Sequence, residues 1–518
     1  MSPSAGRAVS GPIGLSASPP PLRGSRYWAL LAILAAAQGC SRPSQSLDHI
    51  AVLPFENLTG DAALDWAGPA AAAIVIEELA GSSKVVVSRV ENPGEAYQIR
   101  AARFLHGAYT RPANSSGSTL LRMEFRFEDA ASHKIGDATV VTGEPLSVAH
   151  RMAISIDSAA RAFSTASAEA VEAWGHADFA RAVQLDPGFG TAWGLWIQKL
   201  AAEGNPAEAS NTAQRALQQS ALRSEVQRAQ IQLLLAGWRQ DQNGRRSALD
   251  ILARATPNDV AVMSEMVALE MRARRFPEAA AQLRRVLSLR PGDAATLNSL
   301  GYAEASAGNL EAARAALEQY AKQPGQETNA LDSLGEAHFM NGRFTEAAGY
   351  FHQVQRRDPA FLGGTALLKA AHAEWLSGNL AAADATLAPY FSTLAARNDP
   401  AAAWREASWL YTSGRAELAI KKLEASPSEL ATRQLAVWKG QPPLLKDLAA
   451  LEKLYHDSSP LSDGMHRTFY AAALSAAGRN DEAKPLLRRW PLPLEGEPVL
   501  QSLVFPRFLE LRKMLEVR

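Results

Sequence analysis

The chain has 518 residues, with 53 basic side chains, 53 acidic side chains and one cysteine. At roughly 100–200 residues per domain, this length predicts about three domains or one extended repeat array. A hydrophobic fraction of 47% with 20% charged residues excludes wholesale disorder. The balanced charge argues against a general nucleic-acid binder. A single cysteine excludes an intramolecular disulfide framework and a multi-cysteine metal site.

Residues 1–40 follow the plan of a secretory signal peptide. Three arginines and no acid come first, and then the apolar run Tyr27–Ala37 leads into Gln38-Gly39-Cys40. Eleven helical residues reach about 16 Å, which is too short for the ~30 Å hydrocarbon core of a bilayer. We therefore expect this run to direct export rather than to span the membrane.

The end of the apolar run resembles a bacterial lipobox. In the segment Leu34–Cys40 (LAAAQGC), the small residue Gly39 precedes Cys40, while Ala37 and Gln38 depart from the usual pattern. The resemblance implies that Cys40 carries acyl chains, and two or more chains anchor a protein stably at ~0.8 kcal/mol per buried CH₂. Secretion with an unmodified thiol is the alternative.

Cleavage before Cys40 would leave a mildly acidic exported protein. Residues 1–39 contain three arginines and no acid, so the balanced charge of the full chain becomes −3. Ser41, the residue after the cysteine, favours the outer membrane over the inner one by analogy with the sorting of enteric lipoproteins. A polar linker, residues 41–47, then leads to the first folded domain.

A small α/β domain is expected over residues 48–165. Ile50–Phe55 is a short continuous apolar run typical of a buried strand, and Ala70–Leu79 has helical spacing. A second strand at Val85–Val87 and a second helix at Gly94–Arg103 follow. Strands that alternate with helices in this way indicate an α/β layer.

In the second half of this domain, hydrophobicity alternates with a period of two residues. Apolar and charged residues alternate from Leu121 to Glu128, which predicts a strand with one buried face. We expect this strand to pair with Phe104–Arg111 and with Ile135–Thr142, and a helix over Ser147–Phe163 to close the domain. The order of elements predicts an α/β sandwich with a mixed sheet.

Two stretches of this domain carry a family resemblance, Ile50–Asp61 (IAVLPFENLTGD) and His106–Tyr109 leading into Leu120–Asp129. They are similar to the TolB amino-terminal-like domain. The similarity ends after Asp129, where Ile135-Gly136 replaces an aromatic residue common in that domain. The resemblance implies a non-catalytic interaction or sensing module and supplies no site.

A repeat of about 34 residues predicts the architecture of residues 168–490. Leu300-Gly301 recurs as Leu334-Gly335, and Gly308 recurs as Gly342, in both cases 34 residues on. A glycine followed five residues later by an alanine also recurs along the region, at Gly204…Ala209, Gly308…Ala313, Gly342…Ala347, Gly378…Ala383, Gly414…Ala419 and Gly478…Ala483.

This pattern resembles the tetratricopeptide repeat (TPR), a pair of helices. The closest fit is at Leu331, Leu334, Gly335, Gly342, Ala347, Phe351 and Pro359. One pair cannot bury its own apolar face, so the pairs must stack. The expected fold is therefore mainly α, a TPR superhelix (α-solenoid) preceded by the α/β domain. Units near 221–256 and 425–464 fit less well, and residues 491–518 are expected to form a C-terminal helical cap.

The first helices of the pairs are expected to line a concave groove. Aromatic side chains with a few amide and acid groups suit capture of an extended or helical peptide from a protein partner. The alternative is that these side chains pack between helices. The predicted groove residues are Asn298, Tyr302, Asp332, Glu336, Phe339, His372, Trp375, Trp404 and Tyr411.

No P-loop, HExxH, GxSxG or kinase motif occurs in the sequence, so we expect no catalytic residue, metal site or cofactor. The leading hypothesis is a non-enzymatic, lipid-anchored, periplasm-facing cell-envelope protein whose array scaffolds protein–protein interactions. The alternative is a sensory or regulatory periplasmic module, related to those attached to bacterial kinases or adenylate cyclases. A divergent enzyme is a third reading. The oligomeric state and the client protein stay open.

Overall fold

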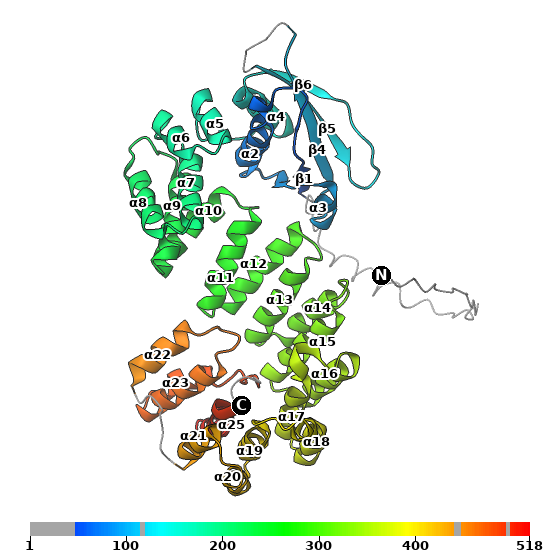
Figure 1. Cartoon of the computed structure of the whole chain (residues 1–518), viewed down its shortest axis with the longest axis vertical. Helices are drawn as coiled ribbons and strands as arrows, with labels where there is room; N and C mark the ends of the chain where they lie inside the picture. The colour runs from blue at the N-terminus through cyan, green and yellow to red at the C-terminus, as the bar shows by residue number, and fades with distance from the viewer. Residues whose placement is uncertain (1–46, 114–119, 440–446, 494–497, 518) are drawn as a thin grey trace, which may run out of the picture. The chain divides into compact units, whose positions relative to one another are not determined.

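The computed structural model describes residues 47–113, 120–439, 447–493 and 498–517. The predicted signal peptide, the predicted lipidation site Cys40 and nearly all of the linker lie outside these residues. A small α/β domain is followed by helix pairs in tandem, which confirms the expected fold class (Figure 1).

A mixed sheet of six strands, counted within the described residues, forms the centre of the α/β domain. Its strands are β1 (Asp48–Val52), β2 (Glu56–Asn57), β3 (Val85–Arg89), β4 (Arg103–Thr110), β5 (Leu121–Asp129) and β6 (Thr139–Gly143). The order is β3-β1-β4-β5-β6, with β2 paired to β4. β1 runs parallel to β3 and β4, whereas β5 is antiparallel to β4 and β6, so the expected mixed sheet is confirmed.

Helices cover both faces of the sheet because side chains alternate along each strand. Ile50 and its neighbours on one face share a core with α2 (Ala67–Leu79) and α4 (Pro145–Ile156). Ala51, on the opposite face, packs instead in a small core with α3 (Pro93–Gln98).

The last expected helix of this domain is shorter than the sequence pattern indicates. α4 ends at Ile156, because the next residue, Asp157, accepts a hydrogen bond from Ser82 Oγ at 2.7 Å and pairs with Lys84 Nζ at 3.0 Å. These contacts tie the chain beside β3. Phe163, expected at the end of the helix, lies beyond it in a non-helical segment and is buried.

The sixth strand also begins later than expected. Ile135 makes only an isolated bridge to Glu128, and β6 starts at Thr139. Asp129 explains the delay, because its carboxylate accepts a hydrogen bond from the backbone N–H of Ser132 at 2.7 Å and so forms a turn there.

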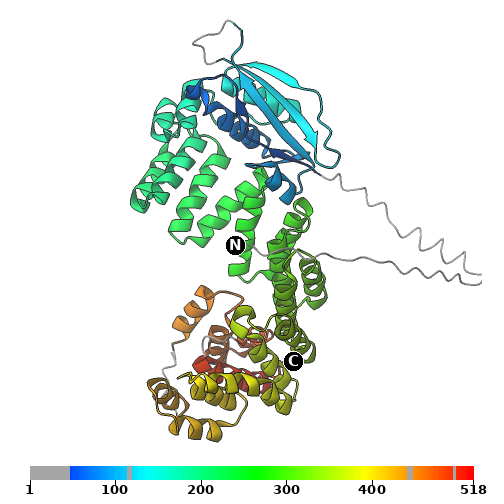
Figure 2. The same cartoon turned by 45° about the vertical axis from the view of Figure 1, so that its right-hand side comes forward.

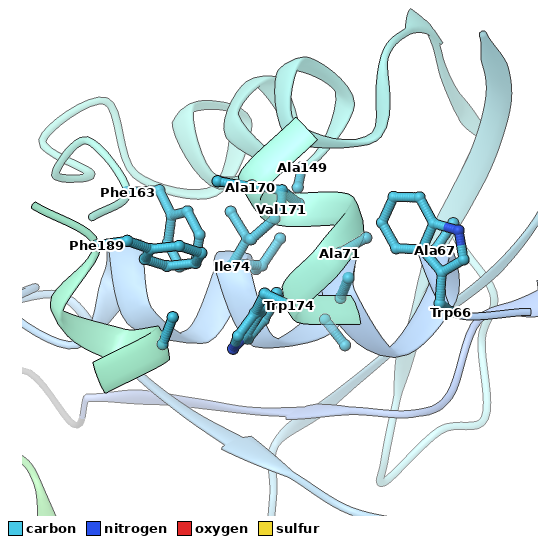
Figure 3. Close-up of a cluster of buried hydrophobic side chains, with 14 of the residues drawn as sticks. Trp66, Ala67, Ala71, Ile74, Ala149, Phe163, Ala170, Val171, Trp174 and Phe189 are labelled. Carbon is cyan, nitrogen blue, oxygen red and sulfur yellow. The ribbon is translucent and has the colours of Figure 1, made fainter. Parts of the chain in front are cut away.

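The α/β domain shares its apolar core with the first helix pair (Figure 3). Phe163 lies 5.7 Å from Trp174 and 5.5 Å from Phe189, measured between ring centroids, and the last two rings are 5.9 Å apart. Trp174 belongs to α5 (Ala168–Gly175), and Ile74 of α2 lies in the same cluster. The packing is therefore continuous across the boundary between the two predicted domains.

The helices that follow pack as hairpins of chain neighbours. The pairs are α5 with α6 (Phe179–Leu185), α7 (Gly190–Ala202) with α8 (Pro206–Gln218), α9 (Glu225–Trp238) with α10 (Gln242–Ala255), α11 (Val260–Arg272) with α12 (Phe276–Leu289), α13 (Ala294–Ser306) with α14 (Leu310–Tyr320), α15 (Glu327–Met340) with α16 (Phe344–Arg357), α17 (Ala366–Leu376) with α18 (Leu380–Ala396), α19 (Ala402–Thr412) with α20 (Ala416–Glu424), and α23 (Gly464–Ala476) with α24 (Asn480–Leu486).

Three further helices depart from this pattern. They are α21 (Glu429–Trp438), α22 (Leu448–Asp457) and α25 (Pro498–Met514). Short 3₁₀ helices also occur, η1 (Ala62–Leu64) in the α/β domain and η2 (Phe361–Gly364) before α17. The region 425–464 therefore differs from a regular pair, as its sequence indicates.

Turns with a left-handed residue connect the helices of a pair. Gly308 and Gly342 have φ values of 85° and 73°, a region that glycine enters without steric cost. Gln240 (φ 54°) and Arg274 (φ 57°) adopt the same conformation without being glycine. The region 221–256 is consequently a regular hairpin, although the glycine pattern is missing from its sequence.

Small residues in the first helices allow the two axes of a pair to approach. A Cβ atom on Gly335 would lie 2.5 Å from the ring of Phe351, and one on Gly301 would lie 2.5 Å from the side chain of Leu317. These are the contacts expected where a TPR pair places a small residue opposite a large one. Among the described helices, none is both long enough and apolar enough to cross a bilayer.

Candidate functional site on the first helices of the array

The predicted groove residues lie on the first helices of four successive pairs, α13, α15, α17 and α19. Asp332, Phe339 and His372 are buried, and the others are half-buried. Most of these residues fall into two groups with different chemistry. We call them the polar cluster (Asn298, Tyr302, Asp332, Ser333, Glu336 and Lys369) and the aromatic cluster (Phe339, His372, Trp375, Trp409 and Phe505).

The polar cluster joins α13 to α15 through hydrogen bonds. Tyr302 Oη donates to Glu336 Oε2 at 2.7 Å and lies 3.2 Å from Ser333 Oγ. Ser333 Oγ in turn donates to Asn298 Oδ1 at 2.9 Å. Residues four apart share one face of a helix, so Asn298 and Tyr302 of α13 meet the facing turn of α15.

A buried lysine, which the sequence interpretation missed, completes this cluster from α17. Lys369 Nζ lies 2.8 Å from each carboxylate oxygen of Asp332 and 2.6 Å from Glu336 Oε1. Burial by itself would lower the pKa of Lys369, but the carboxylates of Glu336 and Asp332 outweigh it and raise that pKa. Burial raises the pKa of Asp332 to about 6, while Lys369 opposes the shift. The cluster is thus a closed network that holds three pairs together.

The aromatic cluster receives a side chain from the C-terminal helix. The ring of Phe505, on α25, lies 5.2 Å from His372, 6.0 Å from Trp375 and 6.4 Å from Phe339, measured between centroids. Trp409 lies 5.2 Å from His372. Phe505 itself is 1% exposed. The part of the array that was predicted to take a peptide is therefore covered by a helix of the same chain.

A second anchor lies one turn earlier on α25. Ser502 Oγ accepts a hydrogen bond from Trp438 Nε1 at 3.0 Å and one from Gln434 Nε2 at 3.4 Å. Gln434 Oε1 accepts a hydrogen bond from Trp404 Nε1 at 3.2 Å, and Tyr411 stacks on Trp438 at 4.3 Å. The remaining predicted groove residues, Trp404 and Tyr411, thus contact α21, which holds α25.

The C-terminal helix also covers the last pair, as the sequence pattern indicates. Phe508 and Leu511 pack in one core with Tyr470 and Leu474 of α23. Figure 2 shows α25, in red, lying among the C-terminal helices of the array. The new finding is that this helix also contacts α15 and α17 through Phe505 and α21 through Ser502, and that it packs against α19.

His372 serves as a packing group in this arrangement. Burial lowers the pKa of His372 to about 4, so the imidazole is neutral at pH 7. Its Nδ1 lies 2.8 Å from the carbonyl oxygen of Leu368, one turn earlier. Within the described ranges, no group of three or more His, Cys, Asp or Glu side chains is arranged to hold a metal ion.

Comparison with known proteins gives distant structural similarities, of which two are described. No family model matches the sequence, and no curated protein matches it. A solved structure of Naa15/Naa10 bound to HypK-THB has 14% identity and a TM-score of 0.29, and the similarity covers 67% of this chain and 64% of that one. The crystal structure of the P58(IPK) TPR domain has 14% identity and a TM-score of 0.20, and the similarity covers 68% of this chain and 95% of that one.

Proposed function

We propose that the chain is a non-enzymatic, lipid-anchored cell-envelope protein whose TPR-like array binds a protein partner at the surface that α25 covers. The observation that supports this most strongly is the burial of the Phe505 ring among aromatic side chains of α15 and α17. A surface that holds one helix through a buried aromatic side chain has the chemistry to hold another, as in recognition of a helix in a groove.

The contacts of α25 specify the kind of partner. Phe505 packs against aromatic rings of α15 and α17, and such buried aromatic anchors dominate binding energy. Ser502, three residues earlier, supplies a hydroxyl to Gln434 and Trp438. The expected partner therefore presents a helix with an aromatic residue and a small hydroxyl residue one turn before it.

Exchange between α25 and a partner would depend on the covalent link between α25 and the array. A segment of the same chain acts at an effective concentration in the millimolar range. A partner must consequently bind tightly or be abundant to displace α25. This competition would restrict binding to specific clients.

The proposed location depends on the first forty residues. The apolar run before Gly39-Cys40 supports export and acylation, and Ser41 favours the outer membrane. The α/β domain, which is similar to the TolB amino-terminal-like domain, would supply a second contact surface. It shares a core with the first helix pair, so it would stay fixed to that end of the array.

A pull-down from detergent-solubilised membranes tests the scaffold, with wild type compared with Phe505→Ala. We expect the Ala variant to recover more of a stoichiometric partner, because its surface is easier to open. Met514→Ala, at a position of the same helix that is 54% exposed, is the matched control and should behave like wild type. Ligand-dependent, substoichiometric partners would favour the regulatory module instead. Turnover of a small substrate with no partner recovered would contradict both.

Metabolic labelling with a clickable fatty acid tests the anchor. We expect label on the wild type and none on Cys40→Ala, which should also leave the membrane fraction. Label retained on the Ala variant would contradict lipidation at Cys40.

A further inference from the structure

A cationic cavity lies between the middle pairs and the terminal helices. It encloses about 350 Å³, and its lining includes Arg274, Arg467, Arg488 and Arg489. Among the described residues, no acidic side chain lines it. Four arginines in the lining of one small cavity form an environment that favours an anion.

One buried carboxylate lies behind this lining. Asp463, whose side chain is 1% exposed, contacts Arg274 Nε at 3.1 Å, Arg467 Nε at 3.1 Å and Arg489 Nη2 at 2.6 Å. The side chains of these three arginines are 10%, 6% and 11% exposed. Three buried positive charges thus share one negative charge.

Carbonyl groups compensate only part of this excess. Arg274 Nη2 donates to the Tyr455 carbonyl at 2.5 Å, near the end of α22, and Arg467 Nη1 donates to the Leu486 carbonyl at 2.9 Å, at the end of α24. Arg467 Nη1 also donates to the Arg489 carbonyl at 2.5 Å, and Arg489 Nη2 donates to the Pro460 carbonyl at 2.6 Å, but these uncharged groups supply no net negative charge. The C-terminus of a helix carries at most roughly half a negative charge. Two helix ends therefore offset about one of the two excess charges.

The pKa of Arg467 agrees with this count. Burial, followed by repulsion from Arg489, lowers it to about 10, and the attraction of Asp463 does not restore it. Arg488 adds a further cation. It is exposed, and its side chain makes no hydrogen bond or ion pair within the part of the chain that the structure describes.

We propose that this cavity binds a small organic anion, a carboxylate or phosphate group on an apolar body. Guanidinium groups bind both oxyanions through paired N–H donors. The apolar part of the lining includes Phe276 and Met340, which suits the body of the ligand. The volume lies within the range of about 300–1,000 Å³ that is usual for small-molecule sites.

Such an anion would join two distant parts of the chain. Arg274 lies in the turn between α11 and α12, and Phe276 is the first residue of α12. Arg467 lies on α23, and Arg489 lies in the segment that follows α24. Arg489 Nη1 also donates to Ser306 Oγ at 3.1 Å, so the two sides already touch. Neutralising the shared positive charge would stabilise this junction, because a ligand that binds only the folded state raises its stability.

Isothermal titration calorimetry on the full chain tests the proposal, with phenyl phosphate, benzoate, inorganic phosphate and neutral phenol as probes. We expect saturable binding of phenyl phosphate or benzoate, weaker binding of inorganic phosphate and none of phenol. Arg488→Gln should raise the Kd about tenfold, which corresponds to about 1.4 kcal/mol. The matched control, Arg479→Gln, removes an equal charge outside the cavity lining, from a side chain paired with Glu482, and should change the Kd less than about twofold.

The pattern of affinities separates the two ligand chemistries, since a carboxylate site prefers benzoate and a phosphate site prefers phenyl phosphate. Absence of saturable heat for all three anions would overturn the proposal, as would equal weakening by the two substitutions. The melting temperature of the wild type gives an independent measurement. It should rise with the preferred anion and not with phenol at matched ionic strength, and an unchanged melting temperature would also overturn the site.

Discussion

The ring of Phe505 lies 5.2 Å from the ring of His372, centroid to centroid, and joins the C-terminal helix to α17. Both side chains are buried, and Trp375 and Trp409 enclose the contact. Several of the predicted groove residues therefore form a surface against which a helix of the same chain, α25, packs.

Removal of the Phe505 ring should loosen α25 first. A Phe→Ala change in a packed core costs about 3–5 kcal/mol. We therefore expect Phe505→Ala to increase hydrogen exchange in α25 strongly and in the α/β domain hardly at all. Met514→Ala, in the same helix but exposed, should leave the exchange of α25 unchanged. Uniform protection of α25 in both variants would show that Phe505 does not hold the helix.

Acid should weaken the packing of α25 against the aromatic cluster, because His372 becomes protonated. The pKa of His372 is lowered from 6.5 to about 4 by burial, so the folded state disfavours the charged imidazole. The neutral imidazole therefore contributes fully to the free energy of unfolding above about pH 6.5. This contribution is lost as the pH falls toward 4, because the unfolded chain takes up a proton that the folded chain excludes. At 1.36 kcal/mol per pKa unit, the loss reaches about 3 kcal/mol.

The measurement for His372 is urea unfolding at pH 7 and pH 5, followed by tryptophan fluorescence. Wild type should lose more stability between these values than His372→Gln, which cannot titrate. Asp332, whose pKa is raised to about 6, increases the free energy of unfolding as the pH falls, but it does so in both proteins and cancels in the comparison. An equal loss in the two proteins would contradict the assignment.

Removal of the buried lysine Lys369 should lower the free energy of unfolding far more than removal of an exposed lysine. Lys369→Met leaves the carboxylates of Asp332 and Glu336 buried without their cation, a change that typically costs about 3–5 kcal/mol. Lys453→Met breaks an ion pair with Asp457 whose lysine side chain is 77% exposed, so it should cost less than about 1 kcal/mol. Urea unfolding of both variants gives the comparison. Equal costs would mean that the polar cluster does not stabilise the array.

Two glycines of one helix pair should respond oppositely to alanine. A Cβ on Gly335 would lie 2.5 Å from the ring of Phe351, so Gly335→Ala should destabilise by about 1–3 kcal/mol. At Gly349, in the second helix of the pair, an added Cβ would meet no neighbouring side chain or other segment within 4 Å. Gly349→Ala should therefore stabilise by up to about 1 kcal/mol, because alanine favours the helix. Thermal unfolding of both variants measures the difference, and destabilisation of equal size would contradict the close approach.

Local patterns were enough to predict much of the fold. The alternation from Leu121 to Glu128 indicates β5 because a half-buried strand imposes that period, and the spacing of Gly308 and Gly342 indicates hairpin turns because glycine tolerates positive φ. The hairpin around Gln240 escaped the same pattern, since there a non-glycine residue takes the left-handed conformation.

Contacts between distant segments could not be predicted in this way. Nothing in the period around Phe505 indicates that its ring reaches His372, because a helical stripe specifies which face is buried but not against which helix. Lys369 was missed because a lysine is rarely buried unless it is paired, and its pairs with Asp332 and Glu336 exist only once α15 and α17 stack. The predicted groove residues lie on neighbouring helices, and their role as a groove stays a prediction, because the segment that packs against them depends on tertiary contacts.

Photo-crosslinking in intact cells from Trp375→p-benzoylphenylalanine tests the central claim most directly, because the Trp375 ring lies 6.0 Å from Phe505. In an otherwise wild-type chain we expect crosslinks within the chain, to α25. Adding Phe505→Ala should shift them to a partner protein, while Met514→Ala should not. Crosslinks to α25 that persist in all three proteins, with no partner captured, would contradict a surface that exchanges its own helix for that of a client.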